Sequence, residues 1–176
     1  MTTTAFLIVD AQNGVLLGKR PCHQVEQVLE RIAFLRGAAR DAGVPVVYVQ
    51  DDDAGEEGSE PWQIHSAIAP APGETVVRKR ACDAFYGTNL HEHLQQLQVT
   101  HLVVTGAKTE YCVDSVCRRA TTLGYNVTLV SDAHTTSDTP ALPAASIIAH
   151  ANWTFDGFDN LENHVEVLPA AEVAFA

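Results

Sequence analysis

The sequence predicts an α/β fold built on a mostly parallel sheet. Short runs of β-branched and apolar residues, such as residues 4–10, have the composition of buried strands. Longer stretches with apolar residues at helical spacing separate these runs along the chain. Strands that alternate with helices form βαβ crossovers, so we expect about five or six strands with helices on both faces. The expected architecture is a three-layer α/β/α sandwich of Rossmann-like type.

The first half of the chain supplies two of these strands. The first is predicted to end at Asp10, and a helix is predicted from about His23, where apolar residues recur every three or four positions. Gly43 suits the left-handed residue that ends such a helix. Residues 44–49 form the second predicted strand. The polar segment 50–74 is predicted to be a loop, and its length is typical of functional loops.

The second half continues the alternation. The predicted elements are a strand at 75–78, a helix at 89–97, a strand at 101–106, a helix at 111–123, a strand at 126–130, a helix around 144–152 and a strand at 165–168. No internal repeat is visible. We therefore expect one domain over residues 1–176.

Composition and charge exclude several classes of function. With 176 residues, 46% of them hydrophobic and 19% charged, the chain can bury a core of its own. The net charge of -11 would repel nucleic acid. No apolar run approaches the roughly 20 residues that cross a bilayer, and the first ten residues lack basic residues and a cleavage pattern. We expect a cytoplasmic protein that binds neither nucleic acid nor membrane.

Three residues of different chemistry follow predicted strands: Asp10, Lys79 and Cys112. Because the carboxyl ends of parallel strands meet at one edge of the sheet, we expect them to be neighbours. A helix N-terminus and an ammonium group would both lower the pKa of the Cys112 thiol. A carboxylate within reach could take the thiol proton and return it to a leaving group. This set predicts acyl transfer to water.

Four stretches carry a longer pattern: residues 104–120 (VTGAKTEYCVDSVCRRA), 6–12 (FLIVDAQ), 79–90 (KRACDAFYGTNL) and 124–133 (GYNVTLVSDA). The first resembles the nucleophile motif of the isochorismatase-like cysteine hydrolases, a superfamily that includes isochorismatases, nicotinamidases and streptothricin hydrolases. The other three stretches match the same superfamily. The resemblance covers nearly the whole chain and implies the same α/β/α fold.

The resemblance also implies roles for individual residues. It implies a catalytic triad of Asp10, Lys79 and Cys112, and a cis peptide bond between Ala107 and Lys108. The backbone N–H groups of Lys108 and Cys112 would then form an oxyanion hole. The implied reaction is hydrolysis of a C–N bond in an amide, lactam or carbamoyl compound through a thioester.

Further residues are candidates for contacts with a small-molecule substrate. Gln12 could orient the substrate or Asp10, as the resemblance suggests, or make a turn hydrogen bond. Trp62, Phe85 and Tyr86 are expected to border the site as aromatic walls, although core packing explains them nearly as well. The acidic segment 51–60 could attract a cationic substrate.

The sequence predicts no metal and no cofactor. Asp51, Asp52 and Asp53 have no histidine near them until His65, so the metal motif of the related nicotinamidases is absent. His91 and His93 are two residues apart on a predicted helix and face different directions. No glycine-rich nucleotide-binding loop follows any predicted strand.

The four cysteines form no CxxC pair, which favours free thiols. Cys117 is expected to pack against the sheet, and packing is the favoured role for Cys82, although it could approach the site. Two other functions stay open. The chain could be an isochorismatase proper, which cleaves a vinyl ether by acid–base chemistry, or a silent binding member of the fold. We also expect a homo-oligomer, and the apolar tail 167–176 could pack on a partner or on its own domain.

Overall fold

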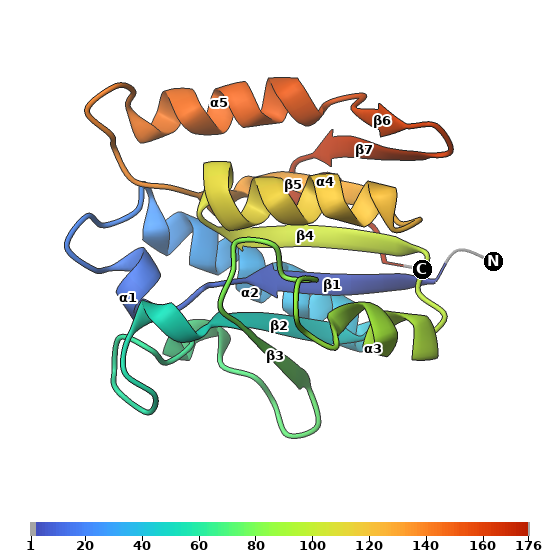
Figure 1. The fold of residues 1–176 in the computed structure, drawn as a ribbon, viewed down its shortest axis with the longest axis horizontal. Coiled ribbons are helices and arrows are strands. Elements are labelled where there is room, and N and C mark those ends of the chain that lie inside the picture. Colours follow the sequence, from blue (N-terminus) through green and yellow to red (C-terminus); the bar gives the residue numbers. More distant parts are fainter. Residues whose placement is uncertain (1–2, 176) are drawn as a thin grey trace.

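The computed structural model describes residues 3–175 and contains a seven-stranded sheet in the order β3-β2-β1-β4-β5-β7-β6 (Figure 1). The strands are β1 (Thr4–Val9), β2 (Val46–Asp51), β3 (Thr75–Lys79), β4 (His101–Ala107), β5 (Asn126–Thr135), β6 (Asp159–Asn160) and β7 (Asn163–Leu168). Every pair is parallel except β6 with β7. The predicted α/β class with a mostly parallel sheet is confirmed.

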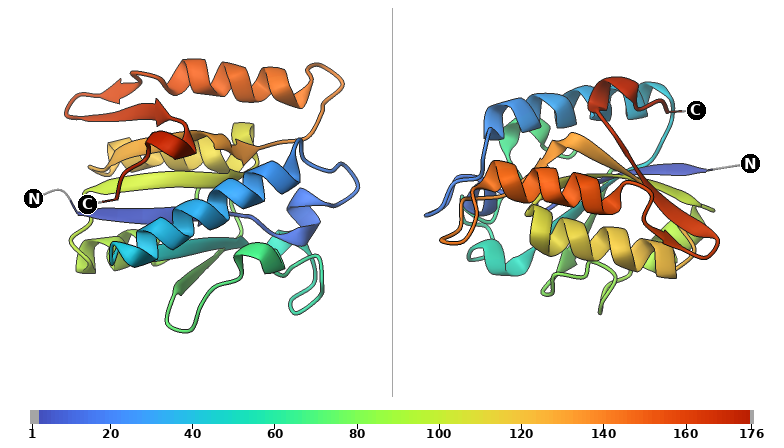
Figure 2. Two further views of the ribbon diagram at one scale, coloured as in Figure 1. Left: turned by 180° about the vertical axis from the view of Figure 1, so that it is seen from behind. Right: turned by 90° about the horizontal axis from the view of Figure 1, so that it is seen from above.

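Helices cover both faces of this sheet. The α-helices are α1 (Asn13–Leu16), α2 (Val25–Asp41), α3 (Leu90–Gln96), α4 (Asp114–Thr122) and α5 (Ala144–Phe155). Short 3-10 turns occupy η1 (Asp52–Ala54), η2 (Ser66–Ile68) and η4 (Ala170–Glu172), and η3 (Thr109–Val113) is a π-helical turn. Helices α3, α4 and α5 lie on one face, and α1 and α2 lie on the other (Figure 2).

The core has two halves, one on each face of the sheet. Apolar residues of α2 recur at helical spacing and pack on alternate residues of β1 and β2, such as Phe6, Ile8 and Tyr48. The intervening residues of β1, including Leu7 and Val9, face α3 and α4. Both faces of β1 are therefore buried, which explains why its sequence is continuously apolar.

The apolar tail packs on its own domain. Val173 and Phe175 belong to the core half around α2. The Phe175 ring meets the Phe6 ring edge-on, with 5.7 Å between the ring centroids. In the described residues 3–175, no helix combines the length and the apolar character that a membrane span requires.

The sheet positions the candidate site at its carboxyl edge. β1 has β2 on one side and β4 on the other. From β1 the sheet is extended first by β2 and β3 on one side, and then by β4 and β5 on the other side, so the strand order reverses at β1. In open α/β sheets, ligands bind outside the carboxyl ends of the strands at such a switch point. The residues that follow β1, β3 and β4 meet at this place.

Several element boundaries differ from the prediction. β2 continues to Asp51, and β5 continues from the predicted end at residue 130 to Thr135. The longer β5 contains a register shift against β4 between Val104 and Gly106, and the polar Ser131 and Asp132 interrupt its apolar pattern. α1 and β6 are too short to leave a periodic signal.

Gly106 offers a test of how closely β1 and β4 approach. Its φ is 117°, and any added Cβ would collide with the carbonyl group of Val9. We therefore expect Gly106→Ala to lower the free energy of unfolding by more than about 3 kcal/mol. Gly43→Ala is a matched control, because Gly43 also has a positive φ but faces open space. Equal losses in the two variants, measured by urea unfolding, would show that the collision is not the cause.

Candidate active site

Asp10, Lys79 and Cys112 come together at the carboxyl edge of the sheet. Asp10 follows β1 and has a φ of 47°, Lys79 ends β3, and Cys112 lies in η3 after β4. The Lys79 Nζ lies 2.8 Å from an Asp10 carboxylate oxygen and 3.4 Å from the Cys112 Sγ. All three residues are buried, with exposed fractions of 1%, 2% and 7%. The lysine therefore bridges a carboxylate and a thiol with little solvent around them.

Asp51 is a fourth member that the sequence analysis did not place at the site. Its carboxylate lies 2.7 Å from the Lys79 Nζ, and the two residues are register partners across β2 and β3. The predicted second strand ended at residue 49, which assigned Asp51 to the acidic loop. A strand two residues longer would have placed it on the same edge as Lys79.

Burial and charge set the pKa values in this cluster. Burial raises the pKa of Asp10 to about 6, although the neighbouring Lys79 ammonium opposes the shift. The pKa of Lys79 lies above its usual value. Burial alone would lower it, but the charges of Asp10 and Cys112 and hydrogen bonds to Asp10 and Asp51 raise it. Lys79 therefore stays charged over the whole range in which Asp10 titrates.

The expectation of a low pKa for Cys112 was wrong. Burial, and then the negative charge of Asp10, raise the pKa of this thiol, and these effects outweigh the attraction of Lys79. A raised pKa favours the protonated form of this thiol. One Asp10 oxygen, Oδ1, is buried without a hydrogen-bond partner among residues 3–175. A carboxylate oxygen of Asp10 also lies within 4.8 Å of the Cys112 Sγ.

The turn that carries the nucleophile has the backbone conformation that the resemblance implied. The Ala107–Lys108 peptide bond is cis. Lys108 is followed directly by η3, whose backbone N–H groups of Tyr111 and Val113 donate to the Lys108 carbonyl group. The Lys108 Nζ donates to the Ser137 Oγ at 2.9 Å. The oxyanion hole at the N–H groups of Lys108 and Cys112 stays a prediction.

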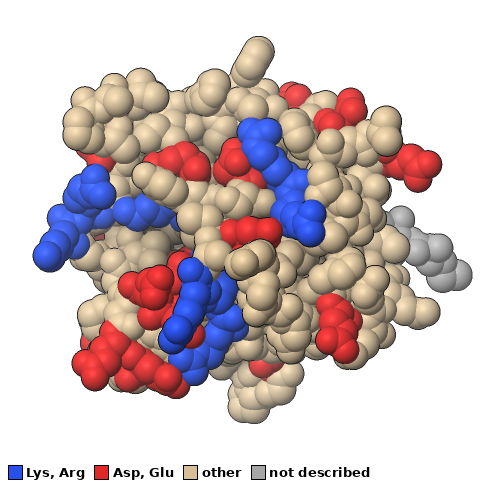
Figure 3. Space-filling model, viewed as in Figure 1, with Lys and Arg blue, Asp and Glu red and all other residues tan. Residues whose placement is uncertain are grey.

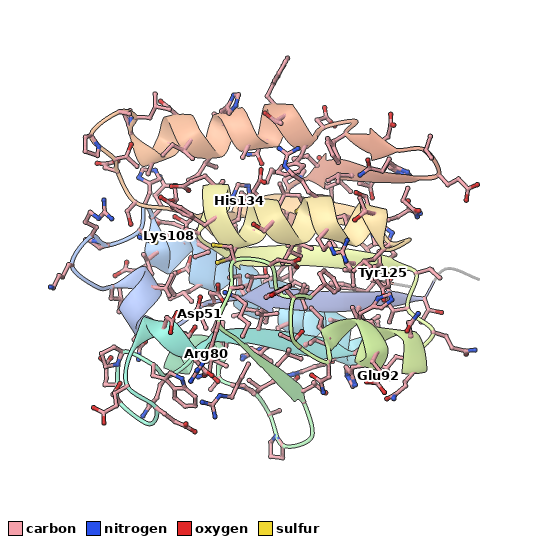
Figure 4. All side chains as sticks on the ribbon, in the orientation of Figure 1. Asp51, Arg80, Glu92, Lys108, Tyr125 and His134 are labelled. Carbon is pink, nitrogen blue, oxygen red and sulfur yellow. The ribbon has the colours of Figure 1, made fainter. Side chains whose placement is uncertain are left out.

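A cavity of about 290 Å³ opens onto the cluster. It is lined by Asp10, Gly14, Val15, Asp51, Asp53, Ala54, Cys82, Lys108, Tyr111 and Cys112. Figure 4 shows Asp51 and Lys108 at the end of the sheet opposite to Tyr125. The cavity is large enough for a small organic molecule and has both charged and apolar walls.

The other residues predicted to contact substrate lie outside this lining. The Gln12 amide is fully buried. It donates to the carbonyl groups of Asp51 and Trp62 and accepts from the Asp51 N–H, so it holds the loop behind the site. Phe85 is buried and stacks on Tyr125. Tyr86 is 74% exposed and borders a separate surface cavity.

Trp62 supports the acidic loop instead of lining the cavity. Its ring lies under the Arg78 guanidinium, and its Nε1 donates to Asp52. Arg78 also pairs with Asp52 and Glu57, so much of the acidic charge of this loop is neutralised. Figure 3 shows the acidic and basic side chains side by side at the lower left, over the loop that follows β2. Two acidic residues of this region line the cavity: Asp51 at the end of β2, and Asp53 in the loop that follows.

The cysteines occupy different environments. Cys117 is fully buried in the core, as predicted. The favoured packing role for Cys82 was wrong, because Cys82 is exposed and lines the cavity beside Cys112. Residues 80–89 form no helix or strand, so no apolar face holds this side chain against the core. Cys22 is buried, and its Sγ contacts the Val15 carbonyl group.

The donors of the cluster could in principle hold a metal ion. Asp10, Asp51 and Cys112 offer ligand atoms within 4.8 Å of one another. The Lys79 Nζ lies within 3.4 Å of all three. A divalent cation at this place would meet the ammonium group at close range, so the donor set fits the lysine better than a metal ion.

Comparisons with known proteins identify the family of this chain. The sequence model of a protein family, the isochorismatase domain, matches residues 4–154. Streptothricin hydrolase of Streptomyces noursei is 37% identical over 97% of this chain, and the chain spans 64% of the length of that relative. N-carbamoylsarcosine amidase of an Arthrobacter species is 31% identical over 59% of this chain and 48% of its own length.

A solved structure extends the similarity to three dimensions. The crystal structure of a putative isochorismatase hydrolase from Oleispira antarctica has a TM-score of 0.85 and 32% identity, covering 97% of this chain and 95% of that one. The curated relatives above are named as a hydrolase and an amidase. The family model, the sequence relatives and the shared fold lead to one conclusion: this chain belongs to the isochorismatase family.

Proposed function

We propose that the chain is a cysteine-dependent hydrolase that cleaves a C–N bond of a small amide, lactam or carbamoyl compound. The observation that carries this proposal is the position of the Lys79 ammonium, in contact with both the Asp10 carboxylate and the Cys112 Sγ. Asp10 and Cys112 in turn line an open cavity. A charged, buried lysine beside both groups stabilises whichever of them carries the negative charge, so a proton can pass between sulfur and carboxylate without leaving an unpaired buried anion.

The proposed reaction has two stages. In the first, Asp10 takes the Cys112 proton, the thiolate attacks the carbonyl carbon, and the oxyanion accepts the N–H groups of Lys108 and Cys112. The C–N bond then breaks as protonated Asp10 gives its proton to the leaving nitrogen. In the second, Asp10 takes a proton from water as the water oxygen attacks the thioester, the C–S bond breaks, and the Cys112 thiolate leaves and takes that proton back from Asp10.

The names of two relatives suggest which substrates to test first. Streptothricin and N-carbamoylsarcosine are the substrates to try first, followed by a panel of small amides and lactams. Release of amine or ammonia, or a mass gain of one water molecule for a lactam, identifies turnover. Turnover that persists in Cys112→Ala would contradict the thioester route.

A second candidate is acid–base cleavage of a vinyl ether, as in isochorismatases proper. The raised pKa values of Asp10 and Cys112 favour it, since a carboxyl group that stays protonated to about pH 6 can act as an acid. In that reaction the thiol would not form a bond to the substrate.

The dependence of kcat/KM on pH separates the two candidates. The thioester route needs Asp10 as carboxylate, so kcat/KM should fall as the pH drops through about 6 and stay constant above it. Vinyl ether protonation by Asp10 would give the opposite slope. Asp10→Asn should abolish the limb near pH 6 together with most of the activity. An unchanged limb in that variant would assign the titration to another group.

The expected homo-oligomer and the small-molecule partner stay proposals. Sedimentation of the purified chain at several concentrations tests the oligomeric state.

A further inference from the structure

The nucleophile turn makes a buried polar contact with the last part of β5. The Thr109 Oγ1 in η3 lies 2.9 Å from the Nδ1 of His134, and both side chains are buried, with exposed fractions of 1%. The other ring nitrogen of His134, Nε2, lies 2.8 Å from the Asn152 Oδ1 on α5. Figure 4 shows His134 at the same end of the sheet as Lys108. Three elements are thus joined through one imidazole ring.

The hydrogen bonds that link Thr109, His134 and Asn152 can be assigned one consistent set of donors and acceptors. The Asn152 Nδ2 donates to the Ser131 carbonyl group at 3.0 Å, so the Asn152 Oδ1 must accept from the His134 Nε2–H. The neutral imidazole then has a lone pair on Nδ1, which accepts a hydrogen bond from the Thr109 hydroxyl group. Burial lowers the pKa of His134, which keeps the ring neutral and preserves this lone pair.

The backbone also determines where the His134 ring lies. His134 is the register partner of Gly106 on β4, beyond the shift in the pairing of β4 and β5. Gly106 comes two residues before Lys108, at which the turn begins. The imidazole therefore stands on the neighbouring strand, next to the point where the nucleophile turn leaves the sheet.

We propose that Thr109, His134 and Asn152 are positioning residues that hold the nucleophile turn so that the Cys112 Sγ stays against Lys79. None of the three lines the cavity in front of Cys112. They act through the turn: Thr109 is three residues before Cys112 in a five-residue π-helical segment, so a shift of Thr109 displaces the sulfur. The proposal rests on the proposed role of Cys112 as nucleophile.

The fold contains a second buried threonine–histidine contact that serves as a control. At the opposite end of β5, the Thr128 Oγ1 lies 2.8 Å from the His101 Nε2, and Thr128 is 3% exposed. The Thr128 Oγ1 also donates to the Glu166 Oε1 at 2.7 Å, so Thr128→Val removes two hydrogen bonds, far from the nucleophile turn along the strand. Both Thr109→Val and Thr128→Val should therefore lower the stability, the second by at least as much, and only the first should affect Cys112.

The test compares Thr109→Val with Thr109→Ser, which retains the hydroxyl group. Thr109→Val is expected to lower kcat about 10- to 100-fold with KM changed less than about threefold, because misplacement of a reacting group acts mainly on the chemical step. It should also raise the apparent pKa for alkylation of Cys112 by iodoacetamide, because the sulfur loses the Lys79 contact. Thr109→Ser should restore both values. All variants carry Cys82→Ser so that Cys112 is the thiol observed in the cavity.

A double-mutant cycle tests the directed chain. Asn152→Ala removes the acceptor that keeps the proton of His134 on Nε2, so the ring can adopt the other tautomer. This variant should reduce kcat as Thr109→Val does, but to a smaller extent. Combined with Thr109→Val it should add nothing, since the orientation of the ring no longer matters without the hydroxyl group. Additive effects would overturn the coupling that we propose.

Two further results would overturn the proposal. One is a Thr109→Val variant that loses stability as Thr128→Val does but keeps kcat and the alkylation profile of Cys112. The other is a Thr109→Ser variant as impaired as Thr109→Val. The alkylation measurement needs no substrate, so failure of the proposed function can be told apart from failure of the positioning role. If the proposed function is wrong, the wild type turns over no compound of the panel. The alkylation profiles of Cys112 then decide by themselves whether these residues position the turn.

Discussion

Replacing Cys112 by alanine is expected to reduce turnover at least about 1,000-fold while the free energy of unfolding changes by no more than about 1–2 kcal/mol. The loss follows from the proposed route, in which the sulfur forms the bond to the substrate and the remaining groups cannot replace it. The stability effect is small because the thiol is one small group whose Sγ borders a cavity. Urea unfolding and product release, measured on the same preparation, check both parts.

The control for this variant is Cys117→Ala. Cys117 is fully buried in the core and does not line the cavity, so its substitution should lower stability and leave kcat unchanged. Intact-mass analysis after brief incubation with substrate should also detect an acyl adduct in the wild type and none in Cys112→Ala. Full turnover in Cys112→Ala would exclude covalent catalysis and favour the vinyl ether reaction.

The sequence predicted the fold and the three central residues of the site for one physical reason. Asp10, Lys79 and Cys112 follow buried strands whose apolar runs are easy to recognise, and parallel strands bring such positions to one edge. The structure places these three residues in contact. Their catalytic roles remain the proposal that the variants test.

The same reasoning missed residues whose positions depend on where a strand ends. Asp51 and His134 lie in the last part of β2 and β5, beyond the apolar runs that defined the predicted strands. Polar residues in a strand leave no periodic signal, so their partners become visible only when the register is known. His134 in particular depends on the register shift between β4 and β5.

The direction of the Cys112 pKa shift could not be predicted because it depends on burial. The sequence identifies the helix that follows the cysteine and a nearby lysine, and both stabilise a thiolate. It does not reveal that Cys112 is 7% exposed and that its thiol lies near the Asp10 carboxylate. Desolvation outweighs the lysine and raises the pKa of the thiol, so the proposed thioester route requires a base, the role proposed for Asp10.

Replacing Lys79 by methionine should abolish activity and also destabilise the protein by about 3–5 kcal/mol at neutral pH, because it leaves the buried carboxylate of Asp10 and the partly exposed carboxylate of Asp51 without their shared cation. Arg40→Met is the control. Arg40 pairs with Glu74 at the surface with 37% of its side chain exposed, and its loss should cost at most about 1 kcal/mol.

The pH dependence of the Lys79→Met variant identifies the cause of its instability. Without Lys79, which lowers the pKa of Asp10, this pKa rises above the wild-type value of about 6, while that of the unfolded chain stays near 3.8. The folded variant then binds the proton more tightly than the unfolded chain, so its stability is lost as the pH rises through the folded pKa and recovers on acidification. Asp10→Asn combined with Lys79→Met should restore much of the stability at pH 8, because it removes one of the two stranded charges. If the double variant were as unstable as Lys79→Met at every pH, lost packing of the lysine side chain would be the cause instead of the unpaired carboxylates.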